Sequence, residues 1–261
     1  MGARRFGQVN WVGLSTLTMR EIRRFTSVWS QTILAPMATA ALFMLVFSLA
    51  LASRRGEVMG VSFTAFLAPG ILMMTVIQNA FANTSSSIMI AKVQGNIVDT
   101  LMPPLSPAEI LAGYVAGGVA RGLFVALTVG AVIFPVAGVG IAAPHWALIF
   151  AFLGSLIFAL TGIAAAILAE KFDHMSAITN FIVTPLSFLS GTFYSISVLP
   201  ETMQRLSAAN PVFYLIDGFR HGILGTSDAS PWIGLVLSLV VAGGLWLLCW
   251  RWLARGFRLK S

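Results

Sequence analysis

The sequence predicts an all-α fold, a polytopic membrane protein with about six transmembrane helices, and three observations point to it. Of the 261 residues, 57% are hydrophobic and only 10% are charged, whereas about 25% of the residues of a typical soluble domain are charged. Several apolar segments reach the roughly 20 residues that a helix needs to cross a hydrocarbon core. Strict alternation of apolar and polar residues, typical of membrane β-barrel strands, is absent from the sequence.

The segment from about residue 10 to residue 29 precedes the first apolar run and has the composition of an amphipathic helix. Apolar residues such as Trp11, Leu17 and Phe25 are interleaved with Arg20 and Arg23. This pattern is typical of a helix lying in the membrane interface, on the cytoplasmic face. A helical extension in solution is the alternative. The first apolar run is too long for a signal peptide, so we expect no cleavage.

Six segments are apolar and long enough to span a membrane, and all except the third are nearly free of charged residues. They cover about Gln31 to Ala52, Phe63 to Asn83, Pro107 to Pro135, Pro144 to Ala169, Ser176 to Tyr194 and Trp232 to Leu253. The stretch between the third and fourth is rich in Pro and Gly, which favours a turn over one continuous helix. We therefore predict a single transmembrane domain over residues 1–261.

A short loop links the second and third predicted spans and carries its own helix signals. Gly95-Asn96 predicts a helix start, and Pro103-Pro104 forces its end. A capping box, Ser106-Pro107-Ala108-Glu109, then opens the third span. A structured loop tied to two spans suits a part that transmits force.

The segment from Ser195 to Ser230 has a different character. It contains two short amphipathic stretches, too polar and too short to span, separated by Asn210-Pro211. We predict re-entrant or interfacial helices on the outer side, where irregular backbone survives if it is buried in protein or faces water. The residues assigned to this outer segment are Leu199, Pro200, Asn210, Pro211 and Arg220.

The distribution of Lys and Arg predicts that both termini are cytoplasmic, because cytoplasmic loops carry an excess of these residues. The formal net charge is +7, but most basic residues flank apolar runs, so we expect no nucleic-acid partner. The predicted cytoplasmic side holds Arg4, Arg5, Arg20, Arg23, Arg24, Lys92, Lys171, Arg251, Arg255, Arg258 and Lys260. The predicted outer side holds Arg54, Arg55, Arg205 and Arg220.

The sequence offers no catalytic, cofactor-binding or metal-binding residues. It has no G-x-x-x-x-G-K-[ST] phosphate loop and no G-x-S-x-G motif. The histidines His145, His174 and His221 fall in separate loops without clustered carboxylates. Cys249 is the single cysteine, which excludes an internal disulfide.

Two features of the third span suggest roles beyond spanning. Gly113, Gly117, Gly118 and Gly122 place small residues four apart, which lets another helix approach closely, within the chain or in a second subunit. Arg121 lies in the same span, where an isolated arginine costs roughly 2.5 to 3.5 kcal/mol on insertion scales. Two interpretations stay open: a snorkelling or structurally paired charge, and a residue lining a substrate route.

Several motifs together resemble those of ABC-2 type exporter permeases, closely the YadH-like bacterial inner-membrane proteins and more distantly the NodJ-like ones. The motifs are Phe66-Leu-Ala-Pro-Gly-Ile-Leu-Met-Met74, Asn96-Ile-Val-Asp-Thr-Leu-Met-Pro-Pro-Leu-Ser-Pro-Ala-Glu-Ile110, Leu189-Ser-Gly-Thr-Phe-Tyr194, Leu199-Pro200 and Asn210-Pro211. The resemblance covers nearly the entire chain.

This resemblance implies a half-transporter in the bacterial inner membrane, homodimeric and paired with two copies of a separate ATPase that binds ATP and Mg. It also implies that the N-terminal helix and the loop after the second span touch the ATPase, while the short outer helices cap the exit. The loop's apolar residues would dock in a groove of the ATPase. The residues assigned to this coupling loop are Lys92, Gln94, Asn96, Ile97, Val98, Asp99 and Leu101.

The expected function is export of a lipid-like, glycolipid or drug-like substrate. Aromatic residues line the route in carbohydrate exporters of this kind, and here Phe outnumbers Tyr 19 to 3, which leans away from a polysaccharide. A secondary, ion-coupled transporter is the alternative, although such carriers usually show acidic residues inside spans or matching broken helices. A membrane-embedded lipid enzyme is a third class, and it would need clustered polar catalytic groups.

Overall fold

The computed structural model describes residues 9–55 and 57–258, with side chains described outside residues 51–55. The helices are α1 (Trp11–Ser27), η1 (Ser30–Leu34), α2 (Ala35–Arg55), α3 (Phe63–Val93), α4 (Ile97–Leu101), α5 (Pro107–Ala137), α6 (Pro144–Leu168), α7 (Phe172–Ile178), η2 (Thr179–Val183), α8 (Thr184–Phe188), η3 (Ile196–Val198), α9 (Glu201–Ala208), α10 (Pro211–Leu224) and α11 (Pro231–Arg255). A small hairpin, β1 (Glu57–Val58) and β2 (Val61–Ser62), joins α2 to α3.

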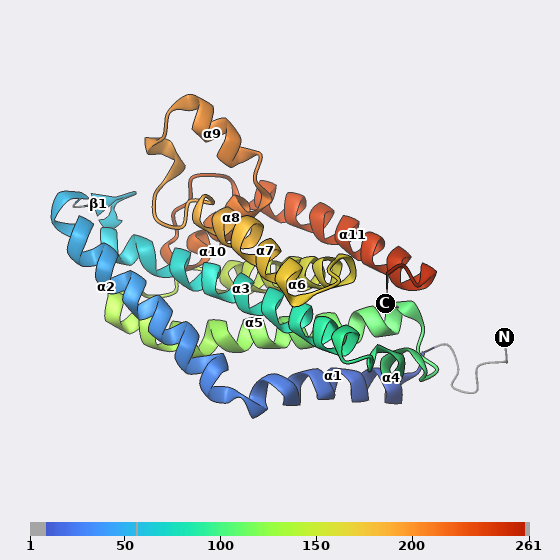
Figure 1. The fold of residues 1–261 in the computed structure, drawn as a ribbon. Coiled ribbons are helices and arrows are strands. Elements are labelled where there is room, and N and C mark those ends of the chain that lie inside the picture. Colours follow the sequence, from blue (N-terminus) through green and yellow to red (C-terminus); the bar gives the residue numbers. More distant parts are fainter. Residues whose placement is uncertain (1–8, 56, 259–261) are drawn as a thin grey trace.

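The long helices lie side by side as one bundle, with α3 and α6 at its centre (Figure 1). Helix α3 packs against both α5 and α6, and α10 lies against α3, α6 and α11. Helix α9 projects away from the bundle (Figure 1). The central position of α3 explains why most of its side chains are buried, polar ones included.

Five of the described helices are long and apolar enough to cross a membrane, which confirms the predicted all-α polytopic fold. They are the run Ser30–Ala50 and the helices Phe63–Val93, Pro107–Ala137, Pro144–Leu168 and Pro231–Arg255. Helix α3 continues to Val93, beyond the predicted end near Asn83. The reason is that the polar residues after Asn83 are mostly buried against α1 and α6, so the helix gains packing there.

The fifth predicted span, Ser176 to Tyr194, differs from the expectation of one continuous helix. It consists of α7, η2 and α8 in succession, and the helical part ends at Phe188. Pro185 has no N–H to donate to the preceding turn, which accounts for the wide π turn before it. Gly191 then adopts a left-handed conformation, φ 75°, which turns the chain away. The count of six spans stays a prediction.

The predicted helix at residues 10–29 is confirmed as α1, which packs along α5 and buries Leu17 and Phe25. Its start is attached to the predicted capping box, which is also confirmed: the Ser106 N–H donates to Glu109 Oε2 at 2.5 Å, and the Glu109 N–H donates to Ser106 Oγ at 3.3 Å. The Asn10 N–H donates to the other oxygen, Glu109 Oε1, at 2.8 Å. One carboxylate thus joins the first turns of α1 and α5.

The glycines of α5 lie where other helices of the same chain pack closely against it. A side chain at Gly113 would meet Leu17 of α1 at 2.6 Å, and one at Gly118 would meet Ala159 of α6 at 2.7 Å. These close approaches account for the glycine spacing without a second subunit. Of the basic residues used to predict orientation, Arg4, Arg5 and Lys260 lie outside the described residues, as do the side chains of Arg54 and Arg55.

Candidate functional site

Helix α4 forms where the sequence predicted it, but its start differs in detail. Gly95 takes the left-handed conformation, φ 76°, that lets the chain turn out of α3. Asn96 occupies the N-cap position but makes no side-chain capping bond. Its Nδ2 donates to Gln94 Oε1 at 3.3 Å instead. The turn at Gly95, more than the asparagine, therefore sets the start of α4.

The exposed face of α4 includes Val98 and Asp99, as predicted, but not Ile97. Ile97 and Thr100 point into the molecule, with exposed fractions of 7% and 5%, because residues three apart share one face of a helix. Val98 and Met102 are 43% and 76% exposed, and Asp99 is exposed beside them. The surface available to a partner is thus Val98, Asp99 and Met102, which we call the α4 outer face.

Lys92 belongs to the bundle and not to that surface. Its Nζ donates to the carbonyl oxygens of Ala166 at 3.0 Å, Ile167 at 3.0 Å and Ala169 at 2.7 Å. These carbonyls end α6, where a helix has no N–H partners of its own and favours a cation. Lys92 thereby fastens the end of α3 to the end of α6.

A buried carboxylate, Glu21 of α1, organises a polar network at the end of the bundle that carries α4. It accepts hydrogen bonds from Ser87 Oγ of α3 at 2.9 Å, from Arg20 NH2 at 3.2 Å and from Arg24 Nε at 3.3 Å. Each of its oxygens is therefore paired, as burial of a charge demands.

Arg20 extends this network to α4 and α5. Its NH1 donates to Thr100 Oγ1 at 3.3 Å, and its NH2 donates to Tyr114 OH at 3.2 Å. Burial lowers the pKa of Arg20, but Tyr114 and Glu21 raise it by more, so that its pKa lies above the ordinary value. A permanently charged guanidinium thus connects α1, α4 and α5.

Arg24 carries the network along α3. Its NH2 donates to the Asn83 backbone oxygen at 2.6 Å and to Asn83 Oδ1 at 2.9 Å, and its NH1 donates to Ser86 Oγ at 3.1 Å. The clue in the sequence was the run Gln78 to Ser87, which is unusually polar for the end of a span. Which helix it faces could not be read from the run itself.

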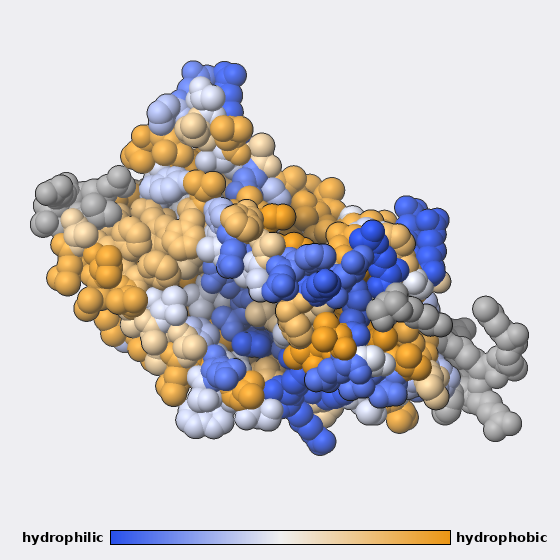
Figure 2. All heavy atoms as spheres, in the orientation of Figure 1, coloured by the Kyte–Doolittle hydropathy of each residue, from blue (hydrophilic) through white to orange (hydrophobic). Residues whose placement is uncertain are grey.

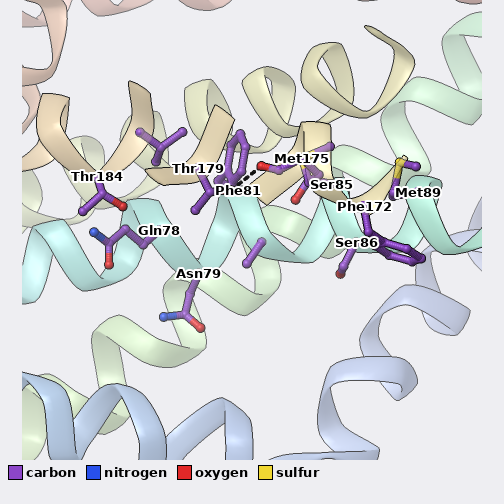
Figure 3. Close-up of a pocket in the computed structure, with 12 residues that line it drawn as sticks. Gln78, Asn79, Phe81, Ser85, Ser86, Met89, Phe172, Met175, Thr179 and Thr184 are labelled. Atoms are coloured by element: carbon purple, nitrogen blue, oxygen red, sulfur yellow. Dashed lines mark hydrogen bonds between the residues drawn. The ribbon is translucent and has the colours of Figure 1, made fainter. Parts of the chain in front are cut away.

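A cavity of about 360 Å³ opens beside the same part of α3, facing α7, η2 and α8 (Figure 3). Its lining mixes amides and hydroxyls with apolar side chains: Gln78, Asn79, Phe81, Ala82, Ser85, Ser86, Met89, Phe172, Met175, Thr179, Val183 and Thr184. We call it the α3 pocket. In the space-filling view of this side of the molecule, hydrophilic residues collect in a hollow near the centre, next to hydrophobic surface (Figure 2).

Arg121 lies beside this pocket, on the neighbouring helix α5. Its NH2 donates to Asn79 Oδ1 at 3.1 Å. Its Nε is buried and has no hydrogen-bond partner, and no described carboxylate lies within ion-pair distance of it. Within the described part of the chain, therefore, no carboxylate neutralises the charge of Arg121.

The outer residues that the sequence singled out lie just before α9 and at or within α10. Pro200 precedes α9, and Pro211 is the first residue of α10. Asn210 Oδ1 accepts from the Val212 N–H at 3.0 Å and caps α10, while its Nδ2 donates to Ser190 Oγ at 2.8 Å. Leu199 is half-buried before α9. Short helices are confirmed here; their place relative to a membrane stays a prediction.

Arg220, which was predicted to lie on the outer side, is fully buried within the protein. Its NH2 donates to the Gly191 oxygen at 2.6 Å, its guanidinium lies 4.0 Å from the centre of the Phe66 ring, and its NH1 is 3.7 Å from Asp217 Oδ1. Cation–π contact and the carboxylate together compensate the buried charge.

Asp217, which sequence reasoning missed, is the anionic half of this pair. Its oxygens accept from the N–H groups of Asp228 and Ala229, both at 2.9 Å. Burial raises its pKa above the usual range, while Arg220 and these two N–H donors act in the opposite direction. The spacing of Asp217 and Arg220, one helical turn apart, was the available signal.

Comparisons with known proteins agree with this architecture. The family model described as ABC-2 type transporter matches residues 13–224. Over 253 residues, covering 96% of this chain and 98% of the relative, the chain is 39% identical to "Inner membrane transport permease YadH" of Escherichia coli strain K12. It is 27% identical over 235 residues, 86% of each chain, to "Nodulation protein J" of Rhizobium leguminosarum bv. viciae. Since the family model covers most of the chain, the protein belongs to the ABC-2 type transporter family.

Proposed function

We propose that this chain is the membrane permease subunit of an ATP-driven exporter, located in a bacterial inner membrane with both termini cytoplasmic. It moves a lipid-like, glycolipid or drug-like substrate outward. Family membership and the printed name of YadH, an inner membrane transport permease, support this assignment. The sequence has no phosphate loop, so ATP and Mg are bound by a separate ATPase. The working unit is two permease copies with two ATPase copies.

The observation that carries the proposal is the way in which α4 is attached to the helix bundle. Its inner face is buried, with Thr100 bonded to Arg20 of α1, and its outer face is exposed. Through Arg20, Glu21 and Ser87, α4 is connected to α1, α3 and α5. A push on the α4 outer face is therefore transmitted to α3 and α5 through charge-assisted hydrogen bonds of 2.9–3.3 Å.

The test is co-expression with a candidate ATP-binding-cassette ATPase from the same genome, followed by measurement of how much ATPase co-purifies with this chain. The double variant Val98→Glu, Asp99→Arg replaces the exposed apolar residue by a charge and reverses the charge at position 99, without touching a buried residue. We expect it to insert normally but to lose most bound ATPase and transport. Ile97→Asp is unsuitable, because Ile97 is buried and the variant would misfold.

Met203→Glu is the matched control. Met203 is 50% exposed on the short helix α9, away from α4, so ATPase binding should be unchanged. Normal ATPase binding and transport by the double variant would contradict the coupling role of α4. Transport that needs an ion gradient and no ATPase would instead support the secondary-transporter alternative.

A further inference from the structure

Arg121 is a cation held within a long apolar helix with too few partners. It lies near the middle of α5 and is half-buried. Its one hydrogen bond goes to Asn79 Oδ1, and the buried Nε has none. An arginine in this position is costly unless something compensates its charge. Since the described residues supply no carboxylate within ion-pair distance, the compensating group is expected to come from outside the chain.

Asn79 connects this cation to the α3 pocket. Its Nδ2 donates to the Thr75 oxygen at 3.0 Å, which fixes the amide so that Oδ1 faces Arg121. Asn79 is also one of the residues that line the pocket, where it lies next to Gln78 (Figure 3). A ligand in the pocket is thus separated from Arg121 by a single side chain.

A second arginine stands at the same wall. Arg24 donates to Ser86 Oγ, and Ser86 lines the pocket two helical turns from Asn79, about 10 Å along α3. Glu21 is the carboxylate within reach of Arg24, and it is shared with Arg20. Two guanidinium groups, those of Arg121 and Arg24, therefore bond to residues of this wall, and of the two only Arg24 has a carboxylate within ion-pair distance.

The rest of the lining is apolar or neutral. Phe81, Met89, Phe172 and Met175 supply apolar surface, and Phe181, next to the pocket on η2, is 80% exposed. Gln78, Ser85, Thr179 and Thr184 supply neutral amide and hydroxyl groups. Such a lining accommodates a chain-like apolar body together with a polar group that accepts hydrogen bonds.

We infer that the α3 pocket selects an amphiphile with an anionic headgroup, a phosphate or a carboxylate, and that Arg121 is the residue that selects for its charge. The inference rests on the proposed function, because it names the substrate class of that exporter. Guanidinium is suited to this role because it stays charged, so that its positive field acts on a headgroup in the pocket across Asn79.

The test uses the full chain in phosphatidylcholine nanodiscs and a fluorescent lysophosphatidic acid as the probe. The matched zwitterionic probe is lysophosphatidylcholine with the same fluorophore, and empty nanodiscs correct for partitioning. We expect saturable binding of the anionic probe, tighter than the zwitterionic one by about tenfold or more, because its phosphomonoester keeps a net negative charge, whereas the choline cation cancels that charge in the other probe and is repelled by the arginine. Inorganic phosphate should compete only weakly, since it lacks the apolar body.

Variants identify the residue responsible. Arg121→Gln should lose that preference, and Arg121→Lys should retain most of it, because the charge remains while the fork is lost. Arg205→Gln is the control, an exposed arginine on α9 that should bind both probes as the unmodified chain does. Equal affinity for the two probes, or an unchanged preference in Arg121→Gln, would overturn the inference. If inorganic phosphate competed as strongly as unlabelled lysophosphatidic acid, the assignment of an amphiphilic ligand would be wrong.

The binding measurement involves neither ATP nor the ATPase. A chain that binds and activates its ATPase yet shows no preference between the probes would overturn the headgroup assignment and leave the exporter proposal standing. A chain that fails to bind any ATPase would contradict the exporter proposal, whatever its preference for the probes.

Discussion

At the scale of single residues, the charges inside this protein fall into two groups that differ in how they are compensated. Arg220 is enclosed by a carboxylate, a carbonyl oxygen and an aromatic ring. Arg121 has a single amide oxygen. The charge of Arg220 is compensated within the chain by a carboxylate, although its Nε and NH1 have no hydrogen-bond partner, and this indicates a structural role. The charge of Arg121 has no described carboxylate beside it and is therefore left for another group to compensate.

The Asp217–Arg220 pair should behave as a coupled structural unit. Arg220→Met leaves a buried carboxylate, and Asp217→Asn leaves a buried cation, so each should destabilise the fold by about 3–5 kcal/mol. The double variant should cost less than the sum, because no unpaired charge remains. Denaturation of the purified chain, followed by circular dichroism, gives the free energies of unfolding for this double-mutant cycle.

The matched comparison is Arg205→Met. Arg205 pairs with Glu201 at 2.6 Å on exposed α9, where an ion pair contributes only about 0–1 kcal/mol. Additive effects of Asp217→Asn and Arg220→Met would mean that the two side chains stabilise the fold independently.

Lys92 should contribute to the stability of the bundle more than to partner binding. Lys92→Met keeps the apolar stem but removes the donors to the carbonyls that end α6, so a loss of about 1.5–3 kcal/mol in unfolding free energy is expected. Lys171→Met removes an exposed lysine of the same end and should change it by less than about 0.5 kcal/mol. Equal stability of the two variants would show that the Lys92 contacts are not needed.

Single residues could be predicted from the sequence, but contacts between residues that are far apart in the chain could not. Arg121 could be singled out because a charge inside an apolar run is visible directly. Its partner Asn79 could not, since the two are 42 residues apart and nothing in the pattern pairs them. The Lys92 contacts were hidden for a further reason: they end on backbone carbonyls, which every residue possesses.

At the scale of helices, starts and ends were predictable where a residue type imposes them. Helices α3, α5 and α6 begin at the predicted residues Phe63, Pro107 and Pro144, because capping and proline chemistry act locally. The buried face of α4 was not predictable. A helix of 5 residues is too short for an apolar period to show which side faces inward.

The close packing of α5 on α6 should depend on Gly118. A methyl group there would meet Ala159 Cβ at 2.7 Å and Thr84 Cγ2 at 2.8 Å, distances that require the helices to separate. Gly118→Ala should therefore lower the melting temperature and destabilise the fold by about 1–3 kcal/mol.

Gly244→Ala is the matched control, because this substitution should not lower the stability of the protein. Nothing lies within 4 Å of a methyl group at Gly244 on α11, so alanine should be neutral or stabilise the helix by up to about 1 kcal/mol. A melting temperature for Gly118→Ala that is equal to or above that of Gly244→Ala would show that α5 and α6 are free to adjust.

At the scale of the whole molecule, composition alone led to the polytopic helical fold, because a membrane imposes simple limits on length and polarity. The arrangement of the helices could not be derived in this way. Helix α3 is central although its composition resembles that of its neighbours, and its polar residues become meaningful only once α1, α5 and α7 are placed around them.

The molecule has two distinct ends, and their orientation is the last property to be tested. Helix α4 and the C-terminal end of α11 lie at one end, while the β1–β2 hairpin lies at the other (Figure 1). Lys92, in the last turn of α3, and Arg255, in the last turn of α11, lie at the α4 end. The positive-inside rule then places the α4 end in the cytoplasm.

Cysteine labelling in intact cells measures this orientation. Cys249 is 0% exposed, so its resistance to thiol reagents would carry no information, and Cys249→Ser supplies the background. Gln94→Cys, beside α4, should react with an impermeant maleimide only after permeabilisation, and Thr202→Cys, on α9, should react at once, since both positions are exposed. The reverse pattern would invert the molecule in the membrane. It would also put the α4 outer face on the side without ATP, and the coupling role proposed for α4 would then be untenable.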